Sequence, residues 1–170
     1  MDFNKSLSSE NIRLEIMTRG DFDRLYNIAK DTEIWAQHND KSRSQVDGFK
    51  KYFDDGLKNP QNCYLIFYNE ELVGSTRYYE YDYIKKSIKV GYTFYAKQYW
   101  GAELNKKVKK LMLDYAFNFI ENVFFDVWYK NIRSQKAVTK LGAKLYENDT
   151  SRERVVFVLN KTDWEELGNN

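Results

Sequence analysis

The stretch "QYWGAELNKKVKK", Gln98 to Lys110, decides how this sequence folds and what it binds. Aromatic residues lead into Gly101, and apolar residues then recur at helical spacing. The first turn of a helix has unpaired backbone N–H groups at the positive end of its dipole, and such an end binds phosphate. Glu103 stands where a phosphate loop usually places a small residue. The stretch therefore predicts either a phosphate-binding turn or a plain turn that starts a helix.

The segments on either side of this stretch form a strand–helix–strand unit. "SIKVGYTFY" (87–95) precedes it, and "VFFDVWY" (123–129) follows a helix predicted over 103–120. Two strands joined by such a crossover are parallel, with a right-handed connection. Ligands of open sheets bind outside the carboxyl ends of parallel strands. We therefore expect "QYWG" and "KNIRS" (130–134) to face the same crevice.

The remaining segments complete the order β-α-α-β-β-β-α-β-α-β-β, which is a mixed α/β (α+β) fold. Asp21 and Ser44 are the predicted N-caps of the first two helices, and Gly142 is predicted to end the last one. Together these elements predict a single domain over residues 1–170. The other predicted strands lie at 12–17, 63–68, 71–81, 143–147 and 154–160, and the other helices at 18–31, 42–57 and 134–142.

Composition narrows the class of protein. Of 170 residues, 42% are hydrophobic and 31% are charged, as in a globular protein, and 27 basic against 25 acidic side chains give no charge argument for nucleic acid. One cysteine, Cys63, and one histidine make a disulfide and a transition-metal site improbable. No run approaches the ~18 apolar residues of a membrane span, and no signal-peptide core is present. These features predict a cytoplasmic protein without a metal or a membrane partner.

Four segments together resemble the GNAT acetyltransferase superfamily, in the branch of ribosomal-protein N-terminal acetyltransferases and their relatives. Their order and spacing match across nearly the whole chain from Leu14. The resemblance implies a mixed, splayed central sheet with helices on both faces. It also implies transfer of an acetyl group from acetyl-CoA to a primary amine. The segments are "LVGSTRYY" (72–79), "VGYTFYAKQYWGAELNKKVKKLMLDYAF" (90–117), "NIRSQKAVTKLGAKL" (131–145) and "RVVFVLNKTDW" (154–164).

The resemblance also implies where acetyl-CoA, the co-substrate, binds. The pantetheine arm pairs with the backbone of Thr93, Phe94 and Tyr95, and with the side-chain amide of Asn131. Ser134 lies near the sulfur and protonates the departing thiolate, although a helix N-cap is an equal explanation for a serine there. Lys106, Lys107, Lys109 and Lys110 add positive charge beside the diphosphate or form a solvated helix face. The diphosphate sits on the amides of a loop that includes Gln98, Gly101, Ala102, Glu103, Leu104 and Asn105.

The sequence departs from the family pattern at two positions. Glu103 replaces the last small residue of the loop, and Lys89 stands where relatives often have a glutamate. We expect Glu103 to turn away from the diphosphate, and Glu103→Gly to lower slightly the stability of the empty protein, because glycine is a poor helix former. Lys89 leaves the general base open. The candidate bases are His38, Glu80, Asp82 and Asp126, and the candidate walls of an amine pocket are Trp35, Tyr78, Tyr79 and Tyr81.

A second class of function keeps the fold and drops the chemistry. With a damaged diphosphate loop, the domain would bind an acyl-CoA as a sensor or act as a dimeric interaction module. Glu103 and Lys89 favour this alternative, and the intact "NIRS" segment opposes it. The acceptor stays open between a protein α-amine, a polyamine, an amino sugar and an antibiotic, and so does a homodimer.

Overall fold

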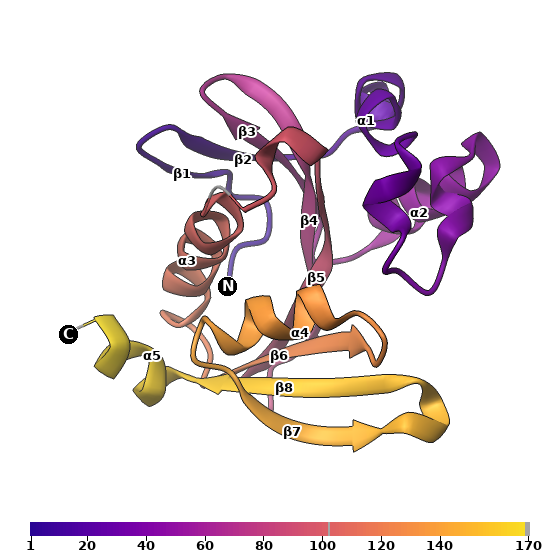
Figure 1. Ribbon diagram of the computed structural model, residues 1–170. Helices are drawn as coiled ribbons and strands as arrows, with labels where there is room; N and C mark the ends of the chain where they lie inside the picture. The colour runs from indigo at the N-terminus through magenta and orange to yellow at the C-terminus, as the bar shows by residue number, and fades with distance from the viewer. Residues whose placement is uncertain (102, 169–170) are drawn as a thin grey trace.

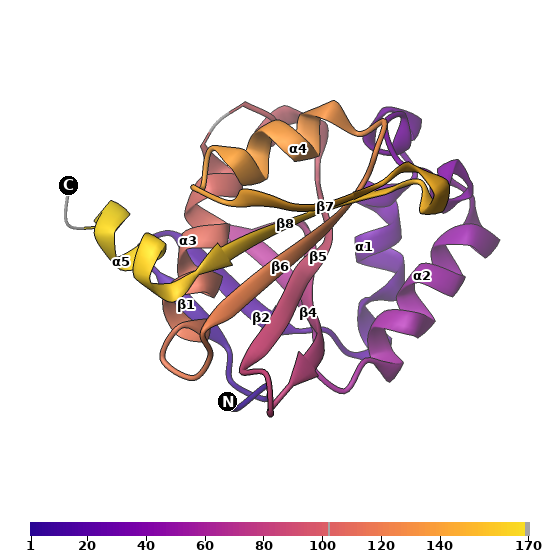
Figure 2. The same cartoon turned by 90° about the horizontal axis from the view of Figure 1, so that it is seen from below.

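The computed structural model describes residues 1–101 and 103–168 and shows an eight-stranded sheet with helices on both faces (Figures 1 and 2). The strands are β1 (Leu7–Ser9), β2 (Ile12–Ile16), β3 (Cys63–Tyr68), β4 (Glu71–Asp82), β5 (Ser87–Tyr95), β6 (Asn122–Trp128), β7 (Lys144–Asp149) and β8 (Arg154–Asn160). They lie in the order β1-β2-β3-β4-β5-β6-β8-β7. Only β5 and β6 are parallel, so the predicted mixed sheet and its parallel pair are confirmed.

The helices are α1 (Phe22–Ala29), α2 (Val46–Lys58), α3 (Leu104–Ala116), α4 (Ile132–Thr139) and α5 (Lys161–Gly168). The described residues also form 3₁₀ turns between these elements: η1 (Arg19–Asp21), η2 (Thr32–Trp35), η3 (Lys41–Ser44), η4 (Lys97–Tyr99) and η5 (Thr150–Arg152). The sequence prediction missed β1 and α5. β1 is a three-residue strand with one buried residue, and α5 buries none, so neither shows a clear apolar period. Within the described residues, no helix is both long enough and apolar enough to cross a membrane.

The strands alternate their side chains between two cores. Along β3, Tyr64 and Ile66 pack with Val108 and Met112 of α3, on what we call the α3 face of the sheet. On the opposite side, which we call the α2 face, the intervening β3 residues pack against α1 and α2. Figure 2 shows α1 and α2 together on one side of the strands and α3 on the other. Burial on both sides places the central strands between two helical layers.

The parallel pair at the centre of the sheet separates after three residues. β5 and β6 pair only through Ser87–Lys89 and Asn122–Phe124. Past Lys89, β5 continues to Tyr95 with no strand along that edge among the described residues. The chain then enters η4 and α3 from β5, and α4 from β6. The two strands diverge from this point (Figure 1), and we call the space between their backbones the opening; its mouth is the end at which η4 and α3 follow β5 and α4 follows β6.

Several local predictions hold, and others need correction. Gly142 has φ +92 and ends the turn after α4, as predicted. Ser44 does not cap α2: Gln45 is the N-cap, and the Ser44 hydroxyl donates to the Lys41 carbonyl at 3.1 Å. Asp21 stands at the N-cap of α1, but its carboxylate turns back to accept from the Thr18 backbone N–H at 2.7 Å. In both cases a preceding 3₁₀ turn takes the side chain that was expected to cap the helix.

Candidate active site

The strand β5 carries a bulge at the level where it leaves β6. Ser75 pairs with Phe94 and Arg77 with Gly91, so Thr76 alone faces two residues, Tyr92 and Thr93. Tyr92 has φ +50, a left-handed value that an L-residue adopts at a cost. An extra residue of this kind bends its strand and turns backbone groups out of the regular ladder. The bulge therefore shapes the wall of the opening next to the predicted pantetheine strand.

A buried lysine binds the bulge from the α3 face of the sheet. Lys109 is 4% exposed and donates from Nζ to the hydroxyls of Thr93 at 2.6 Å and Thr76 at 3.0 Å. Those hydroxyls lie 2.8 Å from each other. Burial lowers the pKa of Lys109 to about 7, and no carboxylate pairs with it among the described residues. Lys109 thus does not belong to the surface charge predicted beside the diphosphate, whereas Lys106, Lys107 and Lys110 are exposed.

The loop before α3 leaves its backbone accessible. Gly101 has φ +78, and Glu103, the N-cap of α3, has φ +52. The exposed Glu103 side chain makes no capping hydrogen bond, so it leaves the first amides of the helix to other partners. At the same end, Asn105 accepts from the Tyr95 hydroxyl at 3.1 Å, which joins the helix start to β5. Gln98 is exposed, Leu104 is buried, and the predicted contact at Ala102 lies outside the described residues.

The second helix at the mouth places Asn131 and Ser134. Asn131 is the N-cap of α4, because its Oδ1 accepts from the Ser134 backbone N–H at 3.0 Å. Its side chain is 3% exposed. The Ser134 hydroxyl, in contrast, makes no hydrogen bond with any described residue, and Ser134 is half-buried. The alternative role of Ser134 as the helix cap is thus taken by Asn131, and its hydroxyl stays available.

The two stretches predicted to share a crevice come together. The Arg133 guanidinium, at the start of α4, lies 4.1 Å from the ring centroid of Trp100 in the loop before α3. The Trp100 indole in turn donates to the carbonyl of Tyr95 at 3.1 Å. Arg133 also donates to the Ile34 carbonyl at 3.4 Å. The start of α4, the end of β5 and the η2 turn therefore meet at one end of the opening.

On the α2 face, two of the four candidate bases meet around Lys89. Its Nζ lies 2.6 Å from the Glu80 carboxylate on β4 and 2.8 Å from the Asp126 carboxylate on β6. Burial alone would lower the pKa of Lys89, but the hydrogen bonds to Asp126 and Glu80 outweigh it, so the pKa is raised. Lys89 thus stands where relatives often have a glutamate, and two other carboxylates, those of Glu80 and Asp126, lie beside it.

The other two candidate bases have different roles. Asp82 accepts from the Lys85 backbone N–H at 2.9 Å in the turn after β4, so it is a turn residue. The ring of His38 packs edge-on against Trp35 at 5.2 Å. Burial, with Arg43 and Arg133 nearby, lowers the pKa of His38 to about 4. His38 is therefore neutral at pH 7.

The predicted aromatic wall divides between the two faces. Tyr79 contacts the Tyr92 ring at 5.0 Å on the α2 face, and Trp35 packs there as well. Tyr78 donates its hydroxyl to the Met112 carbonyl at 2.5 Å on the α3 face. Tyr81 packs on Phe3 at 5.2 Å, also within the α3-face cluster. Only the first two can border an acceptor on the α2 face.

The sequence prediction overlooked Arg77, which lies under the bulge on the α2 face. It is 4% exposed, and its guanidinium sits 3.9 Å from the Tyr92 ring centroid and 5.0 Å from that of Tyr52. No carboxylate pairs with it among the described residues, and it donates to the Tyr52 carbonyl at 3.4 Å. The sequence feature that could have revealed Arg77 is a single charged residue inside the mostly uncharged stretch 72–79 of a central strand. The two aromatic rings compensate part of the cost of burying that charge.

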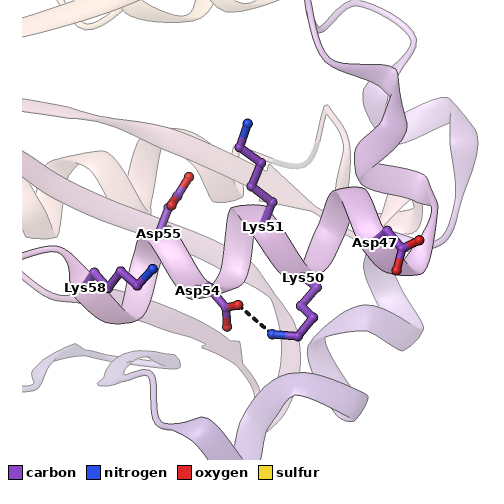
Figure 3. A pocket seen from close by; sticks show the side chains of 6 residues that line it. All are labelled: Asp47, Lys50, Lys51, Asp54, Asp55 and Lys58. Atoms are coloured by element: carbon purple, nitrogen blue, oxygen red, sulfur yellow. Dashed lines mark hydrogen bonds and ion pairs between the residues drawn. The ribbon is translucent and has the colours of Figure 1, made fainter.

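A shallow depression lies elsewhere, along the outer surface of α2 (Figure 3). All of its lining residues belong to that helix, and Lys50 pairs with Asp54 at 2.6 Å. Three lysines and three aspartates balance each other, as on an ordinary solvated helix face. The lining residues are Asp47, Lys50, Lys51, Asp54, Asp55 and Lys58. This depression has no part in the opening between β5 and β6.

A parallel pair that splits open, with a helix starting after each of its strands, is the splayed sheet that the resemblance to the GNAT superfamily implies. A sequence profile described as "Acetyltransferase (GNAT) domain" matches residues 11–144. This match covers more than half of the chain, and the protein belongs to the GNAT acetyltransferase family. The family resemblance seen in the sequence is therefore confirmed. No curated protein matches the chain.

Solved structures share the fold at low sequence identity. A GCN5-related N-acetyltransferase from Brucella melitensis superposes with a TM-score of 0.82 and 14% identity, over 96% of this chain and 82% of that one. RimL, a ribosomal alpha-N-protein acetyltransferase in complex with coenzyme A, gives 0.76 and 15%, over 92% and 98%. Spermidine N-acetyltransferase from Vibrio cholerae, in complex with CoA and spermine, gives 0.69 and 15%, over 92% and 99%. At these identities the likeness establishes the shared fold.

Proposed function

We propose that the protein transfers an acetyl group from acetyl-CoA to a primary amine, either a protein N-terminus or a small-molecule amine. The observation that carries the proposal is the opening between β5 and β6, which has a bulged wall and two helix N-termini at its mouth. An extended pantetheine arm fits such a gap because the free strand edge offers backbone N–H and C=O groups. Structures of family relatives in complex with CoA support the use of an acyl-CoA.

The diphosphate of the cofactor is proposed to sit at the start of α3. The amides there have no capping side chain, and the helix dipole favours an anion. Gln98, Gly101 and Asn105 border this loop, and Glu103 projects from it into solvent. The pantetheine then runs along Thr93, Phe94 and Tyr95 toward the bulge. Asn131 uses its carbonyl oxygen as a cap, which leaves its amide N–H groups for the pantetheine.

The chemistry requires three things of the site. The acceptor nitrogen attacks the thioester carbon, the carbonyl oxygen becomes an oxyanion, and the C–S bond then breaks to release CoA. A backbone N–H at the bulge is well placed to hold the oxyanion, and pre-aimed donors of this kind are often the largest catalytic contribution. Ser134 is proposed to donate its free hydroxyl to the departing sulfur. A neutral amine gives up one proton as the amide forms, and the thiolate takes up one; an acceptor that arrives as an ammonium first gives up a further proton to a base or to water.

The proton leaving the amine is proposed to reach Asp126, directly or through water. Asp126 lies on β6, across the opening from β5, and its Oδ1 is buried without a protein partner among the described residues. Glu80 is a second acid on the same lysine. An α-amine, whose pKa is about 8, needs less help from a base than a lysine side chain, whose pKa is about 10.4. This site therefore suits an α-amine better than a polyamine.

Two measurements test the proposal. Titration with CoA followed by calorimetry should show binding and a higher melting temperature, because a ligand of the folded state stabilises it by mass action. A panel of amine acceptors with acetyl-CoA, followed by free-thiol release, should then identify the acceptor class. No heat and no melting shift at millimolar CoA would rule the proposal out. Binding without thiol release for any amine would favour the sensor or interaction module, which the exposed Glu103 at the mouth still supports.

Ser134→Ala tests the role of the free hydroxyl. We expect kcat to fall by ~10–100-fold while CoA affinity changes little, as for a group that acts mainly in the transition state. Stability should hold, because Asn131 provides the cap of α4. Thr139→Ala, in an exposed position further along the same helix, is the matched control. Unchanged turnover in Ser134→Ala would remove this serine from the mechanism.

A further inference from the structure

Among the described residues, Lys109 is the one buried amine, and the proposed chemistry has no use for it. Its side chain extends from α3 into the sheet and reaches only two hydroxyls. Desolvation of an ammonium group costs free energy unless a carboxylate or several polar groups compensate. Two threonine oxygens compensate in part, so this lysine makes the fold less stable than a well-packed apolar residue would. A residue that weakens the fold at the wall of a candidate active site calls for a functional explanation.

The two hydroxyls that Lys109 binds lie opposite each other across the bulge. Thr76 is the single β4 residue that faces the extra residue of β5, and Thr93 follows that extra residue, Tyr92. From the α3 face, Lys109 therefore connects the β4 side of the bulge to its β5 side. The Thr93 hydroxyl also lies 3.3 Å from the carbonyl of Gly91, on the other side of Tyr92. These contacts fix the backbone direction over the three residues from Gly91 to Thr93.

We propose that Lys109 is a positioning residue for acyl transfer: by binding Thr76 and Thr93 together, it holds the β5 bulge in the geometry that aims its backbone at the thioester. This inference rests on the proposed function, which places the thioester at the bulge. Lys109 itself does not touch the substrate. Its effect passes through the position of the Thr93 backbone, and errors of about 1 Å in such a position lower rates by as much as 100-fold.

Three variants separate this role from a purely structural one. Lys109→Met keeps an unbranched side chain that is one atom shorter and removes its hydrogen bonds. Thr93→Val removes the hydroxyl that the lysine binds. Lys51→Met, at an exposed position on α2 and away from the opening, is the matched control. Each variant is assayed with acetyl-CoA and an amine acceptor for kcat, KM and CoA affinity. Amide hydrogen exchange at residues 91–94 and the melting temperature are measured on the CoA-free chain.

For both Lys109→Met and Thr93→Val, we expect kcat to fall by ~10–100-fold, with CoA affinity and acceptor KM changed by less than ~3-fold. Exchange at 91–94 should be faster than in the wild type. The melting temperature of Lys109→Met should stay the same or rise, because an unpaired buried charge is removed. A structural role predicts the opposite, a lower melting temperature with kcat unchanged.

Other outcomes separate the two proposals. Normal turnover and unchanged exchange in Thr93→Val would overturn the role of Lys109, even if Lys109→Met failed to fold. A wild-type chain that binds no CoA and acetylates no amine would instead refute the proposed function, and the catalytic part of the inference with it. The exchange measurement does not depend on turnover. It therefore tests the bulge contact in either case, and unchanged exchange in Lys109→Met would refute that contact.

Discussion

Two lysines lie on opposite faces of the sheet at β5, and their surroundings shift their pKa values in opposite directions. On the α2 face, Lys89 lies between two carboxylates, Glu80 at 2.6 Å and Asp126 at 2.8 Å. On the α3 face, Lys109 lies between two hydroxyls and is more deeply buried. The pKa is raised for Lys89 and lowered to about 7 for Lys109. The difference shows that burial alone does not decide the charge of a lysine: the partners that the sheet provides on each face decide it.

The largest effect is expected from the lysine without an acid. Because its pKa is lowered on folding, the unfolded chain binds more protons than the folded chain above pH 7, and stability rises with pH in that range. The cost of burying Lys109 at pH 7 is at most about 4 kcal/mol, of which about 2 kcal/mol should be recovered by pH 9. Urea unfolding of the wild type and of Lys109→Met at pH 7 and pH 9 measures this change in the free energy of unfolding.

The comparison of these two chains cancels other titrations, such as those of Cys63 and the buried tyrosines. Burial raises the pKa of Cys63 to about 11 and that of Tyr52 to about 12, so both groups lower stability in strong alkali. The difference between wild type and Lys109→Met should shrink from pH 7 to pH 9. A difference that stayed constant would show that Lys109 is not buried as a charge.

Replacing Lys89, the lysine with two acids, should lower stability, whereas replacing Lys109 should not. Lys89→Met leaves Asp126, which is 20% exposed, without its closest counter-charge, and we expect a loss of about 2 kcal/mol in the free energy of unfolding. Lys86→Met, which removes an exposed pair with Glu121 at 3.7 Å, should cost less than about 0.5 kcal/mol. The double variant Lys89→Met with Asp126→Asn should recover part of the loss. Equal losses for the Lys86 and Lys89 variants would contradict this view of the α2 face.

The half-buried His38 extends the comparison to the acid range. The pKa of His38 falls to about 4 on folding, so the unfolded chain takes up the extra proton first, and stability falls as pH drops below 6.5. We expect a loss of up to about 2 kcal/mol between pH 7 and pH 5. His38→Gln should flatten this part of the pH profile, as seen in thermal melts. An unchanged slope would place the acid sensitivity in another group.

The smallest effect is expected at an exposed charge. Glu103 has φ +52, a conformation that favours glycine, so Glu103→Gly should stabilise the empty protein by about 0.5 kcal/mol after the loss of the favourable dipole contact. CoA affinity should rise a few-fold at low salt and less at high salt, because exposed charges are screened. Calorimetry measures the stability of the empty protein and its CoA affinity at the two ionic strengths. Weaker binding by the variant would mean that the carboxylate supports the cofactor.

The structure thus reverses the stability effect that the sequence predicts for Glu103→Gly. From the sequence, both helix propensity and the favourable charge of an acid at a helix start count against glycine. The left-handed backbone of Glu103 depends on how the loop enters α3, and no residue type near it signals that geometry. In contrast, the helix itself was predictable, because apolar residues recur at 104, 108 and 112.

The buried lysine could have been found, and the bulge could not. Lys109 stands three residues before Met112 and four before Leu113, which are both fully buried, so it shares their face of the helix. Its neighbours Lys106, Lys107 and Lys110 made it look like one more surface charge. The bulge depends on how β4 and β5 pair, and pairing register is a property of two segments together. The site residues taken from the family resemblance remain predictions until ligand binding is measured.

The gap between β5 and β6 also gives the sheet four edges instead of two. The outer edge at β1 is only three residues long, which limits pairing with another chain there. The inner edges, past Lys89 on β5 and past Phe124 on β6, present unpaired backbone within the opening. On the proposed function, an extended cofactor in that gap would take the place of a missing strand. The empty protein is then expected to self-associate more readily than the occupied one.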